Sequence, residues 1–170
     1  MPKYSFDLNC NGERRKLVMT RSVEESEHHL AMKLMAYLMY FEQQPMVEFS
    51  VGQHYKPDLV CCSDGYVDLW IDCGDIGIHK LDRVTTTNHR ARIVVVKPTQ
   101  RSAISYKRLA DRRLRRPERV GYVWFDNEFL DALVESLSTR NELVAEIDRD
   151  RTLIEIEVNG AMLRSRLNRA

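Results

Sequence analysis

The stretch from Lys56 to Gly74, which reads KPDLVCCSDGYVDLWIDCG, constrains the fold of this chain more than any other. A turn sequence at 63–65 separates two runs of strand-forming residues, which predicts a β-hairpin. In the second run apolar residues alternate with polar ones, among them Asp68 and Asp72. Aspartate is a poor strand former. Two aspartates on one face of a strand therefore indicate a functional role.

The length of the turn determines where Asp58 lies. A three-residue loop at 63–65 places Asp58 opposite Trp70, on the same face as Asp68 and Asp72. A two-residue loop would shift the register by one and move Asp58 to the other face. Three carboxylates on one face repel each other unless a cation or a proton joins them, and magnesium takes oxygen ligands of this kind. The alternative is a solvated strand face with scattered acids.

This hairpin resembles the PD-(D/E)XK nuclease superfamily, whose signature is Pro-Asp, a gap, an acid, one residue and a lysine. Pro57-Asp58 and the run from Asp72 to Gly74 are similar to that pattern, with the lysine missing at Gly74. The order of motifs is more closely similar to the YaeQ family of bacterial proteins, over residues 4–162. The segments that carry this resemblance are Pro57–Leu59, Asp68–Gly74, the helical stretch Arg21–Leu38 and the run Val123–Asp126.

The resemblance implies a magnesium-dependent nuclease with a restriction-endonuclease-like core. In that reading Asp58 and Asp72 hold the metal, and Asp68 and Glu25 are further ligands, Glu25 coming from the first helix. Glu25 also lies three residues after Ser22, the spacing of a helix-capping box. Three neighbours on the same helix are relevant as well. Glu27 is in line with the apolar stripe and competes with Glu25 as the site acid, whereas the adjacent His28 and His29 are expected on the surface, where the family usually carries an acid and an arginine.

The missing lysine is the main departure from the superfamily pattern. The resemblance implies that a lysine on the helix after the hairpin replaces it. Arg83 best matches that position, and Lys80 lies one turn earlier, so the two residue types look exchanged. Arginine does not readily release a proton and differs from lysine in geometry. The alternative is that both are exposed basic residues. The lysine is therefore either degenerate or migrated.

The remaining pattern predicts one α/β domain over residues 1–170, with a mixed central sheet and helices on both faces. Hairpins are expected at 4–20 and 142–158, the first extending or covering the main sheet, and residues 164–170 are expected to be a frayed tail. The first helix is predicted to run from Ser22 to about Glu42. A strand–helix–strand crossover is predicted over 67–96, with both strands parallel.

The segment 99–119 is strongly basic and carries a thin apolar helical stripe. It is either a surface that follows a phosphate backbone or a solvated helix. The arginines that we expect to contact nucleic acid are Arg108, Arg112, Arg113, Arg115 and Arg116. Because the net charge of the whole chain is only +1, any affinity for nucleic acid must come from the distribution of charge.

Composition narrows the class of protein. At 170 residues with 44% apolar content, the chain is long enough for a hydrophobic core, and no apolar run or signal peptide predicts a membrane or secreted protein. Its four cysteines form no Cys-x-x-Cys pair, which is typical of a reduced cytoplasmic protein. Two functional hypotheses follow: a magnesium-dependent nuclease, or an inactive nuclease-fold module that binds nucleic acid or a protein partner.

Overall fold

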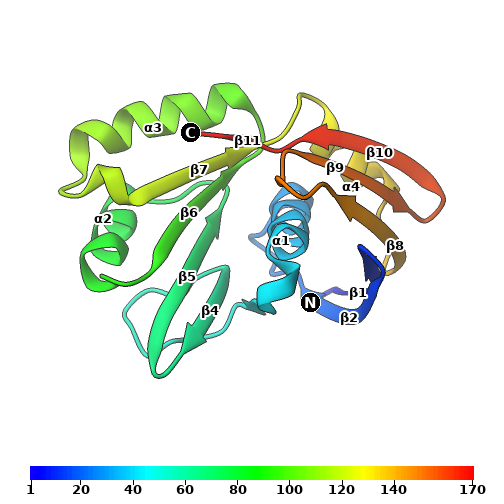
Figure 1. Cartoon of the computed structure of the whole chain (residues 1–170), viewed down its shortest axis with the longest axis horizontal. Coiled ribbons are helices and arrows are strands. Elements are labelled where there is room, and N and C mark those ends of the chain that lie inside the picture. The colour runs from blue at the N-terminus through cyan, green and yellow to red at the C-terminus, as the bar shows by residue number, and fades with distance from the viewer.

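Two mixed β-sheets and four α-helices make up the computed structural model, which describes residues 1–170 (Figure 1). The chain is thus α/β, as predicted, but its strands form two sheets instead of one central sheet. The five-stranded sheet has the order β10-β9-β8-β1-β2, and the six-stranded sheet has the order β11-β7-β6-β5-β4-β3.

The five-stranded sheet joins the two ends of the chain. Its strands are β1 (Lys3–Cys10), β2 (Glu13–Thr20), β8 (Arg140–Ile147), β9 (Leu153–Val158) and β10 (Ala161–Arg166). The predicted terminal hairpins exist, but they combine with each other through parallel pairing of β1 with β8 and do not extend the main sheet. The expected frayed tail is also wrong, because residues 161–166 pair with β9 and β11 (Asn168–Arg169) pairs with β7.

The six-stranded sheet carries the hairpin that the sequence singles out. Besides β11, its strands are β3 (Met46–Val47), β4 (Leu59–Ser63), β5 (Tyr66–Cys73), β6 (Arg92–Lys97) and β7 (Val120–Trp124), and the hairpin consists of β4 and β5. Strands β5, β6 and β7 are parallel, β4 is antiparallel to β5, and β3 is antiparallel to β4. The predicted crossover from β5 to β6 through a helix is therefore confirmed.

The helices divide the interior into two hydrophobic cores. Helix α1 (Glu27–Met39) lies between the two sheets with α4 (Phe129–Ser136) beside it, and α2 (Ile78–Thr87) and α3 (Gln100–Arg113) cover the other face of the six-stranded sheet (Figure 1). The larger core, of 35 residues, surrounds α1, and the smaller core, of 15 residues, lies under α2 and α3. Short 3-10 helices follow α1, at Phe41–Gln43, and α3, at Pro117–Arg119.

Helix α1 begins later than predicted. Ser26 is its N-cap, accepting a hydrogen bond from the His29 N–H at 3.0 Å, and the helix ends at Met39. The expected cap, Ser22, instead forms a turn with Glu25, whose Oε2 accepts from the Ser22 N–H at 3.3 Å. Glu25 therefore precedes the helix. None of the helices combines the length and the apolar character needed to cross a membrane.

The β4–β5 hairpin differs from the prediction in both its turn and its register. Ser63 pairs with Tyr66 across a two-residue turn, whose two residues both have positive φ. This turn alone would place Asp58 opposite Ile71, but a bulge between Cys61 and Cys62 shifts the register by one more residue. Leu59 consequently pairs with Ile71, not the neighbour that the three-residue loop would give, and Asp58 lies next to Asp72.

Candidate functional site

The candidate site lies where the parallel strands β5 and β6 end at their carboxyl edge, beside the start of β4. Asp72 is the second-last residue of β5 and Gly74 directly follows that strand. Lys97 is the last residue of β6, and Asp58 directly precedes β4. In open α/β sheets, ligands bind outside the carboxyl ends of the strands. Helix α1 approaches this edge from one side and α2 from the other.

Asp72 is the most enclosed carboxylate of the site, with 1% of its surface exposed. Its Oδ1 accepts hydrogen bonds from Lys80 Nζ at 2.9 Å and from the Asp58 N–H at 3.3 Å. Its Oδ2 accepts from Trp70 Nε1 at 2.9 Å. Burial raises the pKa of Asp72 above its usual value, and the positive charge of Lys80 works against that rise. Lys80 is thus the counter-charge of a buried acid.

Asp58 has the opposite electrostatic environment. Its Oδ2 accepts from the Cys73 N–H at 2.7 Å and lies 3.1 Å from His29 Nε2. Burial opposes ionisation of Asp58, but the hydrogen bond and the charge of His29 outweigh it and lower the pKa of Asp58. Neighbouring carboxyls whose pKa values are pushed apart are typical of catalytic acid pairs. The same contact raises the pKa of His29 against the effect of burial.

The side chains of Asp58 and Asp72 were expected on one face of the sheet, but they contact helices on opposite faces. Asp72 pairs in register with Val95 and lies with Trp70 on the face covered by α2 and α3. Asp58 instead contacts His29 of α1, on the other side of the sheet. The expected common face for both side chains is therefore wrong. What joins them is the Asp58 backbone N–H, which donates to Asp72.

Glu25 is placed beside a buried lysine that sequence reasoning did not assign to the site. Lys33 has no exposed surface, and its ammonium contacts the Glu25 carboxylate and lies 3.3 Å from Glu48 Oε1. Burial lowers the pKa of Lys33, but the hydrogen bond and the charge of Glu25 and the charge of Glu48 reverse the effect and raise it. Glu25 thus has a structural partner. The four-residue spacing of positions 25, 29 and 33 was the signal for this cluster.

The structure separates the two basic candidates on α2. Lys80 reaches Asp72 and also donates to the Lys56 carbonyl at 3.1 Å. Arg83 is exposed and makes no hydrogen bond or ion pair with either aspartate. Of the two residues, the structure thus brings only Lys80 into contact with Asp72.

Three other acidic or histidine candidates lie away from Asp58 and Asp72. Asp68 is exposed near the hairpin turn, and its charge adds to burial in raising the pKa of the Cys62 thiol. Glu27 is exposed at the start of α1. His28 contacts Asp131 of α4 at 2.6 Å and is half-exposed, in line with the expected surface position. His29, expected on the surface as well, is instead part of the site.

Gly74 explains why the strand carries no lysine. Its backbone is left-handed, with φ of +77°, and a Cβ built there would lie 3.4 Å from Met32 Cε and 3.9 Å from His29 Nδ1 of α1. Nearby, the Gly74 carbonyl accepts from Lys97 Nζ at 2.6 Å. Lys97 is 4% exposed, and burial lowers its pKa, with Asp75 opposing the change. A second lysine thus lies at the same edge of the sheet.

The donor set allows a magnesium ion only with help from water and substrate. No group of three or more His, Cys, Asp or Glu side chains is placed to hold a metal ion. Magnesium usually keeps several waters and binds one or two carboxylates together with substrate phosphates. Asp58 Oδ1 makes no hydrogen bond in the structure, and Asp72 Oδ1 shares its lone pairs with Lys80 and an N–H. Asp58 Oδ1 is thus a free ligand atom, whereas Asp72 could bind a metal ion only if it gave up the contact with Lys80.

Some arginines of the basic segment 99–119 make contacts within the protein. Arg115 contacts Asp82 of α2, and Arg116 contacts Glu118 at 2.7 Å. The guanidinium of Arg119 donates to three backbone carbonyls in and after α2. In contrast, Arg108, Arg112 and Arg113 are exposed and have no ion pair. Of the five arginines expected to contact nucleic acid, these three are free to contact an external anion.

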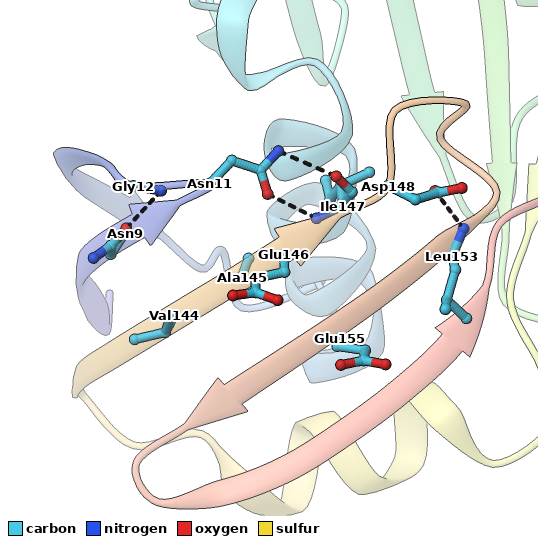
Figure 2. A pocket seen from close by; sticks show the side chains of 10 residues that line it. All are labelled: Asn9, Asn11, Gly12, Val144, Ala145, Glu146, Ile147, Asp148, Leu153 and Glu155. Atoms are coloured by element: carbon cyan, nitrogen blue, oxygen red, sulfur yellow. Dashed lines mark hydrogen bonds between the residues drawn. The ribbon is translucent and has the colours of Figure 1, made fainter.

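One hollow of the surface contains none of these groups. It has a volume of about 600 Å³ and lies on the five-stranded sheet, near the turns after β1 and β8 (Figure 2). Its polar groups hold these turns together: Asn11 exchanges hydrogen bonds with the Ile147 backbone, and Asp148 accepts from the Leu153 N–H (Figure 2). We therefore place the candidate site at Asp58 and Asp72.

Comparison with known proteins supplies the family. The chain is similar in structure to the YaeQ protein from Xanthomonas axonopodis pv. citri, with a TM-score of 0.78 at 16% identity over 98% of this chain and 97% of the other. It is also similar to the YaeQ protein from Pseudomonas syringae, with a TM-score of 0.76 at 17% identity over 98% and 94% of the two chains. No curated protein matches the chain. A sequence model described as "YaeQ protein" matches residues 12–164, and the chain therefore belongs to the YaeQ family.

Proposed function

We propose that the chain hydrolyses phosphodiester bonds in nucleic acid, with magnesium held by Asp58 and Asp72 and with Lys80 as the migrated lysine of a restriction-endonuclease-like core. The observation that carries the proposal is the contact of 2.9 Å between Lys80 Nζ and Asp72 Oδ1, an oxygen that the Asp58 N–H also contacts. The Lys80 ammonium and the backbone of Asp58 thus both contact the Asp72 carboxylate, although the lysine comes from α2 instead of the strand.

Each group has a distinct task in this proposal. Bound magnesium supplies positive charge at the phosphate and makes water a better nucleophile. Asp58 stays ionised at neutral pH because His29 and the Cys73 N–H lower its pKa, so it is available as a ligand. Lys80 is one-quarter exposed and reaches outward from Asp72, where it can offset the charge that develops on a phosphate oxygen.

A cleavage assay on purified protein tests the proposal. Single- and double-stranded DNA and RNA are incubated with magnesium, with manganese and with a chelator. We expect metal-dependent cleavage that Lys80→Ala lowers by at least tenfold. Lys3→Ala is the matched control, because Lys3 is an exposed lysine of β1, in the other sheet, and makes no ion pair. Equal loss in both variants, or cleavage in the presence of the chelator, would contradict the proposal.

A second candidate function is an inactive module that binds nucleic acid or a protein partner. One observation favours it: both oxygens of Asp72 already accept hydrogen bonds from protein groups. If magnesium cannot displace Lys80 from Asp72, the two residues are a structural ion pair. In that case magnesium produces no heat on titration into the protein and no cleavage follows, although nucleic acid still binds.

A further inference from the structure

A second surface lies along α2 from Asp72 and has the composition of a binding groove. Two hollows of about 480 Å³ and about 180 Å³ lie between the segment 49–55, α2 with the residues after it, and the tip of the β4–β5 hairpin. Gln53 and Thr87 line both hollows, which makes them neighbours. We call them together the loop–helix groove. The larger hollow is within the size range of small-ligand pockets.

The exposed aromatic side chains of the protein gather in this groove. Phe49 and Tyr66 are the most exposed Phe, Tyr or Trp residues, with 49% and 51% of their surface exposed. Both line the larger hollow. The guanidinium of Arg90 lies 3.9 Å from the centroid of the Tyr66 ring. Tyr55 lines the smaller hollow. Exposed rings next to an arginine form a stacking surface for flat aromatic groups such as nucleobases.

The groove is also free of negative charge. Neither hollow is lined by an aspartate or a glutamate, although the chain contains 25 of them against 26 lysines and arginines. The ionisable side chains at its wall are Arg83, Arg90, His54 and His89 besides the tyrosines and Cys62. A lining of this kind favours an anionic ligand over a cationic one.

Side-chain hydrogen bonds hold the groove in shape. The Gln53 amide donates to Asn88 Oδ1 at 2.6 Å and accepts from Asn88 Nδ2 at 3.0 Å. Asn88, the C-cap of α2, also donates to the Val84 carbonyl at 3.0 Å. The irregular segment after β3 is thereby fixed to the end of α2. A wall fixed before binding lowers the entropy cost of binding a ligand.

We propose that the loop–helix groove binds a single strand of nucleic acid, with a base stacked at Tyr66 and Phe49 and phosphates at Arg90 and Arg83. Positions 80, 83 and 87 share one face of α2, so the strand would run along this helix toward Lys80. Tyr66 and Asp72 are six residues apart on β5, a span of about 20 Å, which is long enough for several nucleotides. Stacking on protein side chains requires unpaired bases, which excludes a regular duplex. The direction of the strand rests on the proposed function, but the binding itself does not.

The test is fluorescence anisotropy of labelled eight-nucleotide oligothymidine, oligouridine and a duplex of the same length, with a chelator present. We expect both single strands to bind better than the duplex. Loss of a stacked base lowers affinity about tenfold, which is the effect expected for Tyr66→Ala. Tyr66→Phe keeps the ring and should bind like the unmodified protein. Arg90→Gln should weaken binding and flatten its salt dependence, whereas Arg140→Gln, at an exposed arginine of β8 without an ion pair, should do neither.

Several outcomes overturn the proposal: no binding of either single strand, a preference for the duplex, or unchanged affinity in Tyr66→Ala with its fold intact by circular dichroism. Because the chelator prevents metal-dependent hydrolysis, the result is separate from the cleavage assay. Binding that depends on Tyr66 without any cleavage in magnesium would refute the proposed function and leave the groove in place. Metal-dependent cleavage together with unaltered binding by Tyr66→Ala would support the proposed function and refute the groove.

Discussion

Lys80 Nζ lies 2.9 Å from Oδ1 of the buried Asp72 and 3.1 Å from the carbonyl oxygen of Lys56. The lysine therefore ties the start of α2 to the end of β5 and to the segment that leads into Asp58. A charge removed from a buried pair leaves its partner uncompensated, so this contact matters for stability as well as for chemistry.

The His29–Asp58 contact should stabilise the fold in a defined pH window. The folded-state pKa of His29 is raised, so its contribution is complete below its unfolded pKa of about 6.5 and is lost as the pH rises through the folded value. The folded-state pKa of Asp58 is lowered, so its contribution is present above its unfolded pKa of about 3.9 and is lost as the pH falls through the folded value. Both groups contribute fully only between these limits.

His29→Gln should therefore lower the free energy of unfolding by about 1 kcal/mol near pH 5, and by less as the pH rises above 7. Urea unfolding at a series of pH values measures the difference. His89→Gln controls for the loss of a histidine, because His89 is exposed and makes no ion pair. A destabilisation that is the same at pH 5 and pH 9 would mean that the histidine acts only by packing.

The Lys33–Glu25 pair should be structural and not part of metal binding. Lys33→Met leaves the carboxylate of Glu25 buried without a partner, which should cost about 3–5 kcal/mol of stability. Adding Glu25→Gln should recover much of that loss, and magnesium affinity should not change in Glu25→Gln alone. Urea unfolding and calorimetry measure the two effects. Loss of magnesium binding in Glu25→Gln would restore Glu25 as a ligand.

Replacing Gly74 by lysine should not restore the superfamily motif. The backbone at Gly74 has φ of +77°, a conformation that costs an L-residue about 1–2 kcal/mol. Gly74→Lys should destabilise the protein and should not raise metal-dependent cleavage. Gly74→Ala has the same backbone penalty without the amine and is the control. Faster cleavage by Gly74→Lys than by Gly74→Ala would show that a lysine can act from the strand after all.

The arginines of the basic segment should fall into two groups. Arg108, Arg112 and Arg113 are unpaired, so their replacement by glutamine should lower the slope of affinity for nucleic acid against salt by up to about 3. Arg115→Gln breaks a contact with Asp82 and should affect stability more than that slope. Salt titrations of binding distinguish the groups. An unchanged slope in the triple variant would make this surface a solvated helix only.

Local patterns in the sequence predict local structure well here. The alternation in β5, the apolar run of β6 and the helix between them define the crossover, and the hairpins at both ends are found close to the expected residues. The parallel pairing of β1 with β8 was not predictable, because it joins segments more than 130 residues apart whose hydrophobic patterns do not encode their partner. The start of α1 was missed because both Ser22 and Ser26 are good caps.

The candidate site was predictable in part for the same reason. Asp58 and Asp72 are neighbours, but their register depends on the bulge between Cys61 and Cys62, which no residue pattern predicts. The burial of Lys33 was not predictable either, because the acids that compensate its charge, Glu25 and Glu48, both lie outside α1. The choice between Lys80 and Arg83 depends on which side of α2 faces the end of β5. That is a property of packing and not of spacing.

The most direct measurement is calorimetric titration of magnesium into the unmodified protein and into Asp72→Asn, followed by a cleavage assay on the same samples. The proposed function predicts magnesium binding and metal-dependent cleavage in the unmodified protein, with both lost in Asp72→Asn. Lys80→Ala should keep magnesium binding and lose cleavage, since it removes no oxygen ligand. Magnesium binding that survives in Asp72→Asn, or no binding and no cleavage by the unmodified protein, would contradict a hydrolytic site at Asp58 and Asp72.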